Sequence, residues 1–169
     1  MSTNLTSHRC WVYGDNVNTD VIFPGKYTYT ARTKDEIASH ALEDLDPNFA
    51  KEVQPEDIIV AGRNWGCGSS REQAVTALKF AGIRLIIAAS FARIYFRNCI
   101  NQGLRPIVLP EAHSLVRSGD TIHIDWQERH IWIGDHRFSM PRYSPSVEAI
   151  LAAGGLVPML QRQFQQEEK

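Results

Sequence analysis

The segment that most constrains the fold of this chain lies between residues 55 and 90. PEDIIVAG (55–62) and IRLIIAAS (83–90) are continuous apolar runs, as is typical of strands buried on both faces. SREQAVTALKFAG (70–82) lies between them, carries small and apolar residues on one broad face and ends in a glycine that suits a helix C-cap. This order predicts a βαβ unit, with two parallel strands and a right-handed crossover.

The rest of the chain extends this unit in two different ways. A helix is expected over 91–102, followed by a third short strand over 105–110. TIHIDWQERHIWIGDHRFSM (121–140) alternates apolar and polar residues around a polar break, which predicts an antiparallel hairpin or meander. A proline-started helix is expected over 145–153. The predicted fold class is therefore α/β, with a βαβ core of parallel strands plus an antiparallel β-hairpin.

The N-terminal part predicts a strand over 9–14, a polar loop containing GDNVNTD, and an amphipathic helix over 33–45. The length of 169 residues suits one domain, so we expect a single domain over 1–169. The polar residues 1–8 and 161–169 are expected to fray.

Composition excludes several classes of function. Apolar residues make up 43% of the chain, but no apolar run reaches the length of about 18 residues needed for a membrane span, so no membrane partner is expected. The net charge is −1 with scattered cations, which argues against nucleic acid as a partner.

The three cysteines Cys10, Cys67 and Cys99 form no C-x-x-C, so neither a disulfide framework nor a metal site within this chain is indicated. The beginning of the chain lacks the apolar core of a secretory signal, and a cytoplasmic location is expected.

The loop GRNWGCGSSREQA (62–74) is the candidate functional site. Its glycines let a ligand approach backbone N–H groups, and the start of a helix favours an anion. The loop matches neither the Walker pattern nor the dinucleotide-binding pattern. Arg71 directly follows two serines and offers a planar fork, which fits a carboxylate better than a lysine would. A carboxylate ligand is therefore favoured over phosphate.

Two interpretations of Ser69 stay open on the residues alone. Ser69 and Glu72 have the spacing of a capping box, in which the serine caps the helix and the glutamate bonds back to its amide. Alternatively, Ser69 acts as a base, because the positive end of a helix and a neighbouring Arg71 both stabilise an alkoxide. One serine could serve both roles.

Three stretches carry a resemblance to a known family: GDNVNTDVI (14–22), GRNWGCGSSRE (62–72), and SFARIYFRN (90–98) with NQGL (101–104). Together they resemble the small subunits of isopropylmalate dehydratases, which are similar to the swivelling C-terminal domain of aconitase. The resemblance runs from about residue 9 to about residue 155. It implies a swivelling β/β/α aconitase C-terminal-like fold.

The resemblance also implies roles for single residues. Ser69 corresponds to the catalytic base, Ser70 and Arg71 to groups that bind the substrate's carboxylate and hydroxyl, and Asp20 to an acidic residue that faces the same site. It implies no cofactor in this chain and a 4Fe-4S cluster in a separate large subunit, one iron of which acts as a Lewis acid. The implied reaction is a dehydration and rehydration that converts 2-isopropylmalate to 3-isopropylmalate in leucine biosynthesis. The chain would be inactive alone.

The resemblance leaves the choice of substrate open. In the family, the loop after Pro-Gly reads the substrate's side chain and commonly contains Tyr-Leu followed by Arg or by an apolar residue. Here Tyr27, Thr28, Tyr29 and Thr30 stand instead. Tyr29 suits an alkyl group, but Lys26 or Arg32 could supply charge if the loop folds inward.

The substrate expected from this loop is isopropylmalate. Homoaconitate and an alkylmalate such as 2,3-dimethylmalate are alternatives. A non-catalytic regulatory domain that binds small anions is an alternative of another class, and a homo-oligomer is possible for the isolated chain.

Overall fold

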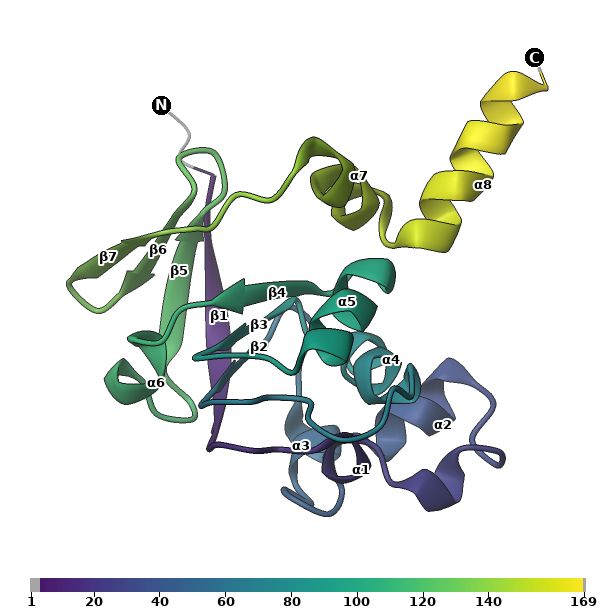
Figure 1. Cartoon of the computed structure of the whole chain (residues 1–169). Helices are drawn as coiled ribbons and strands as arrows, with labels where there is room; N and C mark the ends of the chain where they lie inside the picture. Colours follow the sequence, from purple (N-terminus) through teal and green to yellow (C-terminus); the bar gives the residue numbers. More distant parts are fainter. Residues whose placement is uncertain (1–3, 169) are drawn as a thin grey trace.

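A computed structural model describes residues 4–168, and it is organised around a seven-stranded mixed sheet (Figure 1). The strand order is β4-β3-β2-β1-β5-β6-β7. The strands are β1 (Leu5–Tyr13), β2 (Ile58–Ala61), β3 (Leu85–Ala88), β4 (Arg105–Val108), β5 (Thr121–Asp125), β6 (His130–Ile133) and β7 (His136–Ser139). β1 to β4 are parallel to one another, whereas β5 to β7 form an antiparallel meander. The expected α/β class is confirmed.

The long strand β1 joins the two halves of the sheet. Its residues Leu5–Arg9 pair antiparallel with β5, and its residues Cys10–Tyr13 pair parallel with β2 on the other edge. Residues 5–8, expected to fray, are therefore part of the sheet. The sequence-based expectation was wrong here because Thr6 and His8 gain strand partners far along the chain, in β5.

The parallel strands are buried on both faces, which explains their continuous apolar sequences. Ile59 and Ala61 of β2 face one hydrophobic cluster, and Ile58 and Val60 face another. The first cluster packs against helices α4 and α5, and the second lies between the parallel strands and the antiparallel meander.

Helices cover the parallel half of the sheet and extend past it at one end (Figure 1). The helices of residues 4–168 are α1 (Thr19–Ile22), the 3-10 turn η1 (Gly25–Tyr27), α2 (Lys34–Ser39), α3 (Phe49–Glu52), α4 (Gln73–Phe80), α5 (Arg93–Asn101), α6 (Ala112–Leu115), α7 (Pro145–Ala153) and α8 (Leu156–Glu167). The crossovers β2-α4-β3 and β3-α5-β4 confirm the predicted βαβ core.

The helix expected over 33–45 is shorter than predicted. α2 begins at a capping box formed by Thr33 and Glu36 but ends at Ser39. The chain then turns, and Leu42 adopts a positive φ of 56° and donates its N–H to the carbonyl of Ile22 at 2.8 Å. Leu42 is fully buried, so packing in the core has overridden continuation of the helix.

The C-terminal segment also differs from the expectation. Residues 161–167, expected to fray, belong to α8, which projects beyond α7 and away from the sheet (Figure 1). Its glutamine-rich sequence has good helix propensity, and the sequence interpretation gave more weight to its polarity. Within residues 4–168, no helix is long and apolar enough to cross a membrane.

Candidate functional site

Three loops that follow neighbouring parallel strands form the candidate site. The loop after β1 is joined to the loop after β2 by N–H donation from Asn16 to Arg63, from Gly66 to Val17 and from Thr19 to Cys67, each at 2.8 Å. The loop after β3 joins them through Ala92, whose N–H donates to the carbonyl of Trp65 at 2.9 Å. The carboxyl ends of parallel strands are where ligands bind in open α/β sheets. The candidate site therefore lies at the edge of the sheet where this type of fold commonly binds ligands.

A glycine in the loop after β2 shapes this corner. Gly66 has a positive φ of 79°, and a Cβ there would lie 2.1 Å from the ring of Tyr95. Tyr95 is buried and donates its hydroxyl to the carbonyl of Ala74 in α4 at 2.8 Å. Burial raises the pKa of Tyr95 well above its usual value, so the phenol stays a neutral donor. Gly66 thereby lets the loop lie directly on the helix α5 that carries Tyr95.

The structure shows whether Ser69 caps helix α4. α4 begins at Gln73, its N-cap is Glu72, and no side chain caps it. The predicted capping box is therefore wrong. Ser69 is exposed, and its Oγ accepts a hydrogen bond from Nε of Arg71 at 3.1 Å and lies 3.0 Å from Oγ1 of Thr19. These contacts hold the serine away from the start of α4, and the residue stays exposed.

Arg71 links three segments of the chain. Its Nε donates to Ser69, its Nη1 donates to Oγ1 of Thr28 at 3.2 Å, and its Nη2 forms an ion pair with Asp20. The side chain of Arg71 is 20% exposed, whereas that of Asp20 is 74% exposed. The structure therefore brings together Ser69, Arg71 and Asp20, the three residues that the resemblance implied for one site. The guanidinium keeps N–H groups beyond these three bonds, because it has five.

Ser70 is exposed beside them. Its backbone carbonyl accepts a hydrogen bond from Nδ2 of Asn98 at 3.1 Å, which ties the serine pair to α5. α5 thus helps to hold the backbone of the site in place.

The predicted specificity loop divides into two parts. Thr28 reaches Arg71, and its carbonyl accepts a hydrogen bond from Nε2 of Gln73 at 3.3 Å. Tyr27 points elsewhere, because its ring stacks on His40 at 3.5 Å and its hydroxyl donates to Glu43 at 3.0 Å. Tyr29 is 87% exposed and Thr30 is exposed. The side chain of Thr28 is therefore the one this loop places on the guanidinium.

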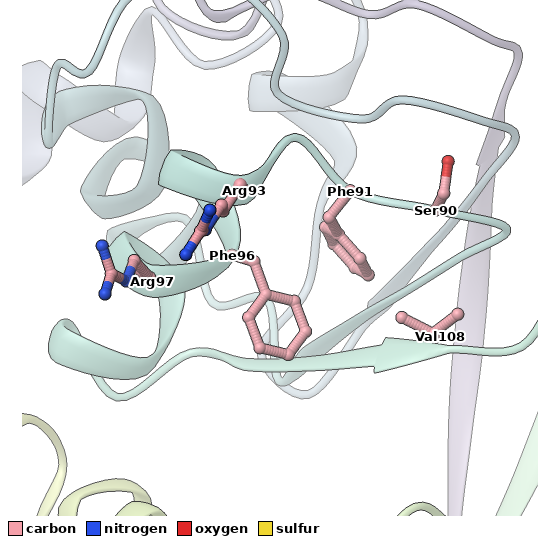
Figure 2. Close-up of a pocket in the computed structure, with 6 residues that line it drawn as sticks. All are labelled: Ser90, Phe91, Arg93, Phe96, Arg97 and Val108. Atoms are coloured by element: carbon pink, nitrogen blue, oxygen red, sulfur yellow. The ribbon is translucent and has the colours of Figure 1, made fainter.

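A cavity of about 460 Å³ lies beside the ends of β3 and β4. In Figure 2 the rings of Phe91 and Phe96 lie between Val108 and the two arginines, and Arg93 and Arg97 project from α5 away from Ser90. None of the predicted site residues lines this cavity. Ser69, Ser70 and Asp20 of the candidate site are instead exposed at the surface.

The two buried cysteines, Cys10 and Cys99, do not fit a cluster site. Burial raises the pKa of Cys10 to about 12 and also raises that of Cys99, which disfavours the thiolate form that binds iron. Within residues 4–168, no group of three His, Cys, Asp or Glu side chains could hold a metal ion.

Thr19 is the residue that sequence reasoning missed. It is 1% exposed, and its Oγ1 accepts a hydrogen bond from the N–H of Ser69 at 3.0 Å. The signal in the sequence was its position directly before Asp20 in a loop already assigned to the site. The arrangement as a whole offers one hydroxyl as a base and one guanidinium to hold an anion beside it.

Comparison with known proteins gives the family. Residues 14–112 match the model of the aconitase C-terminal domain. The chain is 41% identical over 162 residues to a 3-isopropylmalate dehydratase small subunit from Thermodesulfovibrio yellowstonii, with 95% of this chain and 96% of that one covered. It is 46% identical over 158 residues to a methanogen homoaconitase small subunit from Methanocaldococcus jannaschii, with 91% and 90% covered.

A solved structure agrees with these matches. A crystal structure described as 3-isopropylmalate dehydratase from Methanocaldococcus jannaschii superposes with a TM-score of 0.88 at 42% identity, covering 98% of this chain and 99% of that one. The resemblance seen in the sequence is confirmed in both sequence and fold. This chain belongs to the aconitase C-terminal domain family.

Proposed function

We propose that this chain is the small subunit of a 3-isopropylmalate dehydratase, a hydro-lyase that acts together with a large subunit. The observation that carries the proposal is the hydrogen bond from Arg71 to Oγ of Ser69 at the exposed corner of the sheet. It places a candidate base next to a candidate anion clamp. The relatives named as small subunits of 3-isopropylmalate dehydratase support the same assignment.

The chemistry assigned to this chain is proton removal next to a held carboxylate. Arg71 binds a substrate carboxylate through the N–H groups that its ion pair with Asp20 leaves available. Ser69, as the alkoxide, takes the proton from the neighbouring carbon, and that C–H electron pair becomes the second bond of the alkene. The substrate hydroxyl leaves with the electron pair of its C–O bond and takes up a proton from solvent to form water. Readdition of water with the two positions exchanged gives the isomer.

The departure of the substrate hydroxyl requires a Lewis acid, and residues 4–168 of this chain offer no metal site that could supply one. We assign it to a large subunit whose 4Fe-4S cluster would supply Lewis-acid chemistry. The surface that carries Ser69, Ser70 and Asp20 is open, which suits a site completed by a partner. The complex would work in the cytoplasm on a 2-hydroxy diacid, in leucine biosynthesis.

The specificity loop favours an alkyl-substituted substrate. The group that it places on Arg71 is the neutral hydroxyl of Thr28, and Nζ of Lys26 lies over the Tyr27 ring at 5.1 Å. A substrate with a third carboxylate would be better matched by a cation at this point. Relatives at 46% and 49% identity are named homoaconitase small subunits, so homoaconitate is the competing substrate, and an alkylmalate such as dimethylmalate is a third.

Reconstitution tests the proposal. The chain is mixed with a cluster-loaded large subunit, and isomerisation is measured on 2-isopropylmalate, homoaconitate and 2,3-dimethylmalate. We expect turnover to require both subunits and to be fastest with 2-isopropylmalate.

Faster turnover of homoaconitate would reassign the substrate and keep the reaction. Absence of turnover on all three diacids, with a complex that forms, would leave a non-catalytic domain that binds small anions. The oligomeric state of the chain alone, measured by light scattering, is the accompanying control for complex formation.

A further inference from the structure

Thr19 occupies a fixed position under the proposed base. It is the first residue of α1, its N–H donates to the carbonyl of Cys67 at 2.8 Å, and its carbonyl accepts the N–H of Phe23 at 2.9 Å. Its side chain is 1% exposed. Both backbone bonds and burial therefore fix the direction in which Oγ1 points.

The two contacts of Thr19 Oγ1 with Ser69 differ in direction. The backbone N–H of Ser69 can only donate, so Oγ1 is the acceptor in that bond at 3.0 Å. The second contact joins the two hydroxyl oxygens, also at 3.0 Å, and either could donate. Because Oγ1 already accepts from the amide, its own proton is available for the oxygen of Ser69.

When Ser69 is deprotonated, the hydrogen bond between its oxygen and Oγ1 of Thr19 can run in only one direction. An alkoxide has no proton to give, so it must accept from every neighbour. Arg71 Nε already donates to it at 3.1 Å, and Thr19 Oγ1 lies at donor distance. Hydrogen bonds donated to an anion stabilise it and so lower the pKa of the group from which it forms.

Gly68 makes room for this arrangement. Its φ is +108°, and a Cβ there would lie 3.1 Å from Oγ1 of Thr19. A side chain at position 68 would crowd the threonine hydroxyl. The glycine between Cys67 and Ser69 thus gives Thr19 access to both the amide and the hydroxyl of the same serine.

We infer that Thr19 is a positioning residue whose hydroxyl holds Ser69 in place and donates to its oxygen when the serine is ionised. The inference rests on the proposed function, because it needs Ser69 to act as the base. Charged and titratable groups around this pair are Arg71, Asp20 and the thiol of Cys67 in the same loop.

The test compares Thr19→Val with Thr19→Ser in the reconstituted complex. Valine keeps the shape and removes the hydroxyl, whereas serine keeps the hydroxyl. We expect Thr19→Val to lower kcat about 10- to 150-fold at neutral pH, the range for losing a hydrogen bond to a charged group. We expect KM to change little, because Arg71 still holds the carboxylate.

The pH profile separates positioning from a merely structural role. Loss of the donor raises the pKa of Ser69, so the acidic limb of kcat against pH moves to higher pH by about one unit or more in Thr19→Val. Thr19→Ser restores the wild-type limb. Repeating the profile in a Cys67→Ala background excludes the thiol as the titrating group. If valine prevents folding, Thr19→Ala replaces it, with circular dichroism and complex formation as checks.

Wild-type turnover in the same assay keeps the two claims apart. No wild-type turnover contradicts the proposed function. If the wild-type complex turns over but the acidic limb of the pH profile is not shifted in Thr19→Val, only the role of Thr19 is contradicted. A Thr19→Ser variant as impaired as Thr19→Val would show that keeping the hydroxyl does not preserve turnover, and it would also contradict the role of Thr19.

Discussion

At the scale of single residues, Arg71 is the group on which the site depends most. It contacts Ser69, Thr28 and Asp20, which come from three different segments. A lysine has three donors on one atom and cannot span these partners. The planar guanidinium therefore aligns the candidate base with both the specificity loop and the acidic residue.

Replacing Arg71 with lysine should weaken substrate binding and slow turnover together. We expect KM to rise about 10- to 100-fold, because a bidentate charged contact is replaced by a point charge. Steady-state kinetics of the reconstituted complex measures this change. Lysine at the exposed Arg97 of α5 is the matched control and should leave KM unchanged. Unaltered substrate affinity in Arg71→Lys would contradict the clamp.

The sequence predicted part of this residue-level arrangement. The order of residues 69–71 pointed to a serine beside an anion-binding arginine, and Asp20 was implied by the resemblance of its loop to the family. The capping box failed because Ser69 is drawn to Thr19 and Arg71 rather than to the start of α4. Thr19 was missed because it lies 50 residues from Ser69 in the chain, and no local spacing encodes that contact.

At the scale of elements, the site depends on loops packed against helices. The loop after β2 lies on α5 only because Gly66 leaves space for Tyr95. The hydroxyl of Tyr95 in turn holds the carbonyl of Ala74 in α4. One glycine thus fixes how the loop after β2 lies between two helices.

Gly66→Ala should destabilise the protein strongly. The new methyl would overlap the buried ring of Tyr95, and the positive φ adds strain, so we expect a loss of about 3 kcal/mol or more. Gly134→Ala is the control, because it has a positive φ of 56° but open space around its Cβ. Urea unfolding measures both. Equal losses in the two variants would show that the contact with Tyr95 is unimportant.

Helix α7 is attached to the sheet through Glu148. Its carboxylate accepts hydrogen bonds from Nη2 of Arg105 at 2.7 Å and from Nη2 of Arg129 at 3.3 Å. The hydrogen bond with Arg105 is the main cause that lowers the pKa of Glu148 below its usual 4.5. The ionised carboxylate is therefore favoured in the folded state.

This pKa shift predicts how stability depends on pH. A carboxyl group whose pKa is lower when folded stabilises the protein above its unfolded pKa, and that contribution is lost as pH falls through the folded pKa. Glu148→Gln should therefore cost about 1–3 kcal/mol at pH 7, and the difference from wild type should shrink below about pH 4.5. Denaturant unfolding across this range measures it, and a difference independent of pH would contradict the pairing.

Elements were predictable where burial leaves a continuous pattern. The apolar runs at 55–62 and 83–90 gave β2 and β3, and the proline-started helix at 145 gave α7. The short helices α3 and α6 and the long α8 were not predicted. The first two are single turns of four residues each, so no apolar pattern marks them. α8 was missed because the polarity of its outer residues was given more weight than their helix propensity.

At the scale of the whole molecule, the site and the C-terminal helix lie at different ends. The loops and α1 gather at the carboxyl ends of the parallel strands, whereas α8 projects beyond α7 (Figure 1). Residues 161–168 are all exposed. The sheet and the site should therefore form without the outer part of α8.

Deleting residues 161–169 tests this independence. We expect a change of less than about 1 kcal/mol in the free energy of unfolding, because exposed residues contribute little. Turnover of the reconstituted complex should be unaffected. A fall of several degrees in Tm or a loss of complex formation would show that this end of the chain contributes to the fold or to the partner interface.

The central claim is that an exposed serine of this chain acts as the base in a site shared with a partner. The most direct measurement is kcat for 2-isopropylmalate in the reconstituted complex, with wild type and Ser69→Ala, together with the Tm of each chain. We predict that Ser69→Ala lowers kcat about 10³-fold or more with a nearly unchanged Tm, since Ser69 caps no helix. An active Ser69→Ala complex, or one that loses activity only because the chain unfolds, would contradict the account.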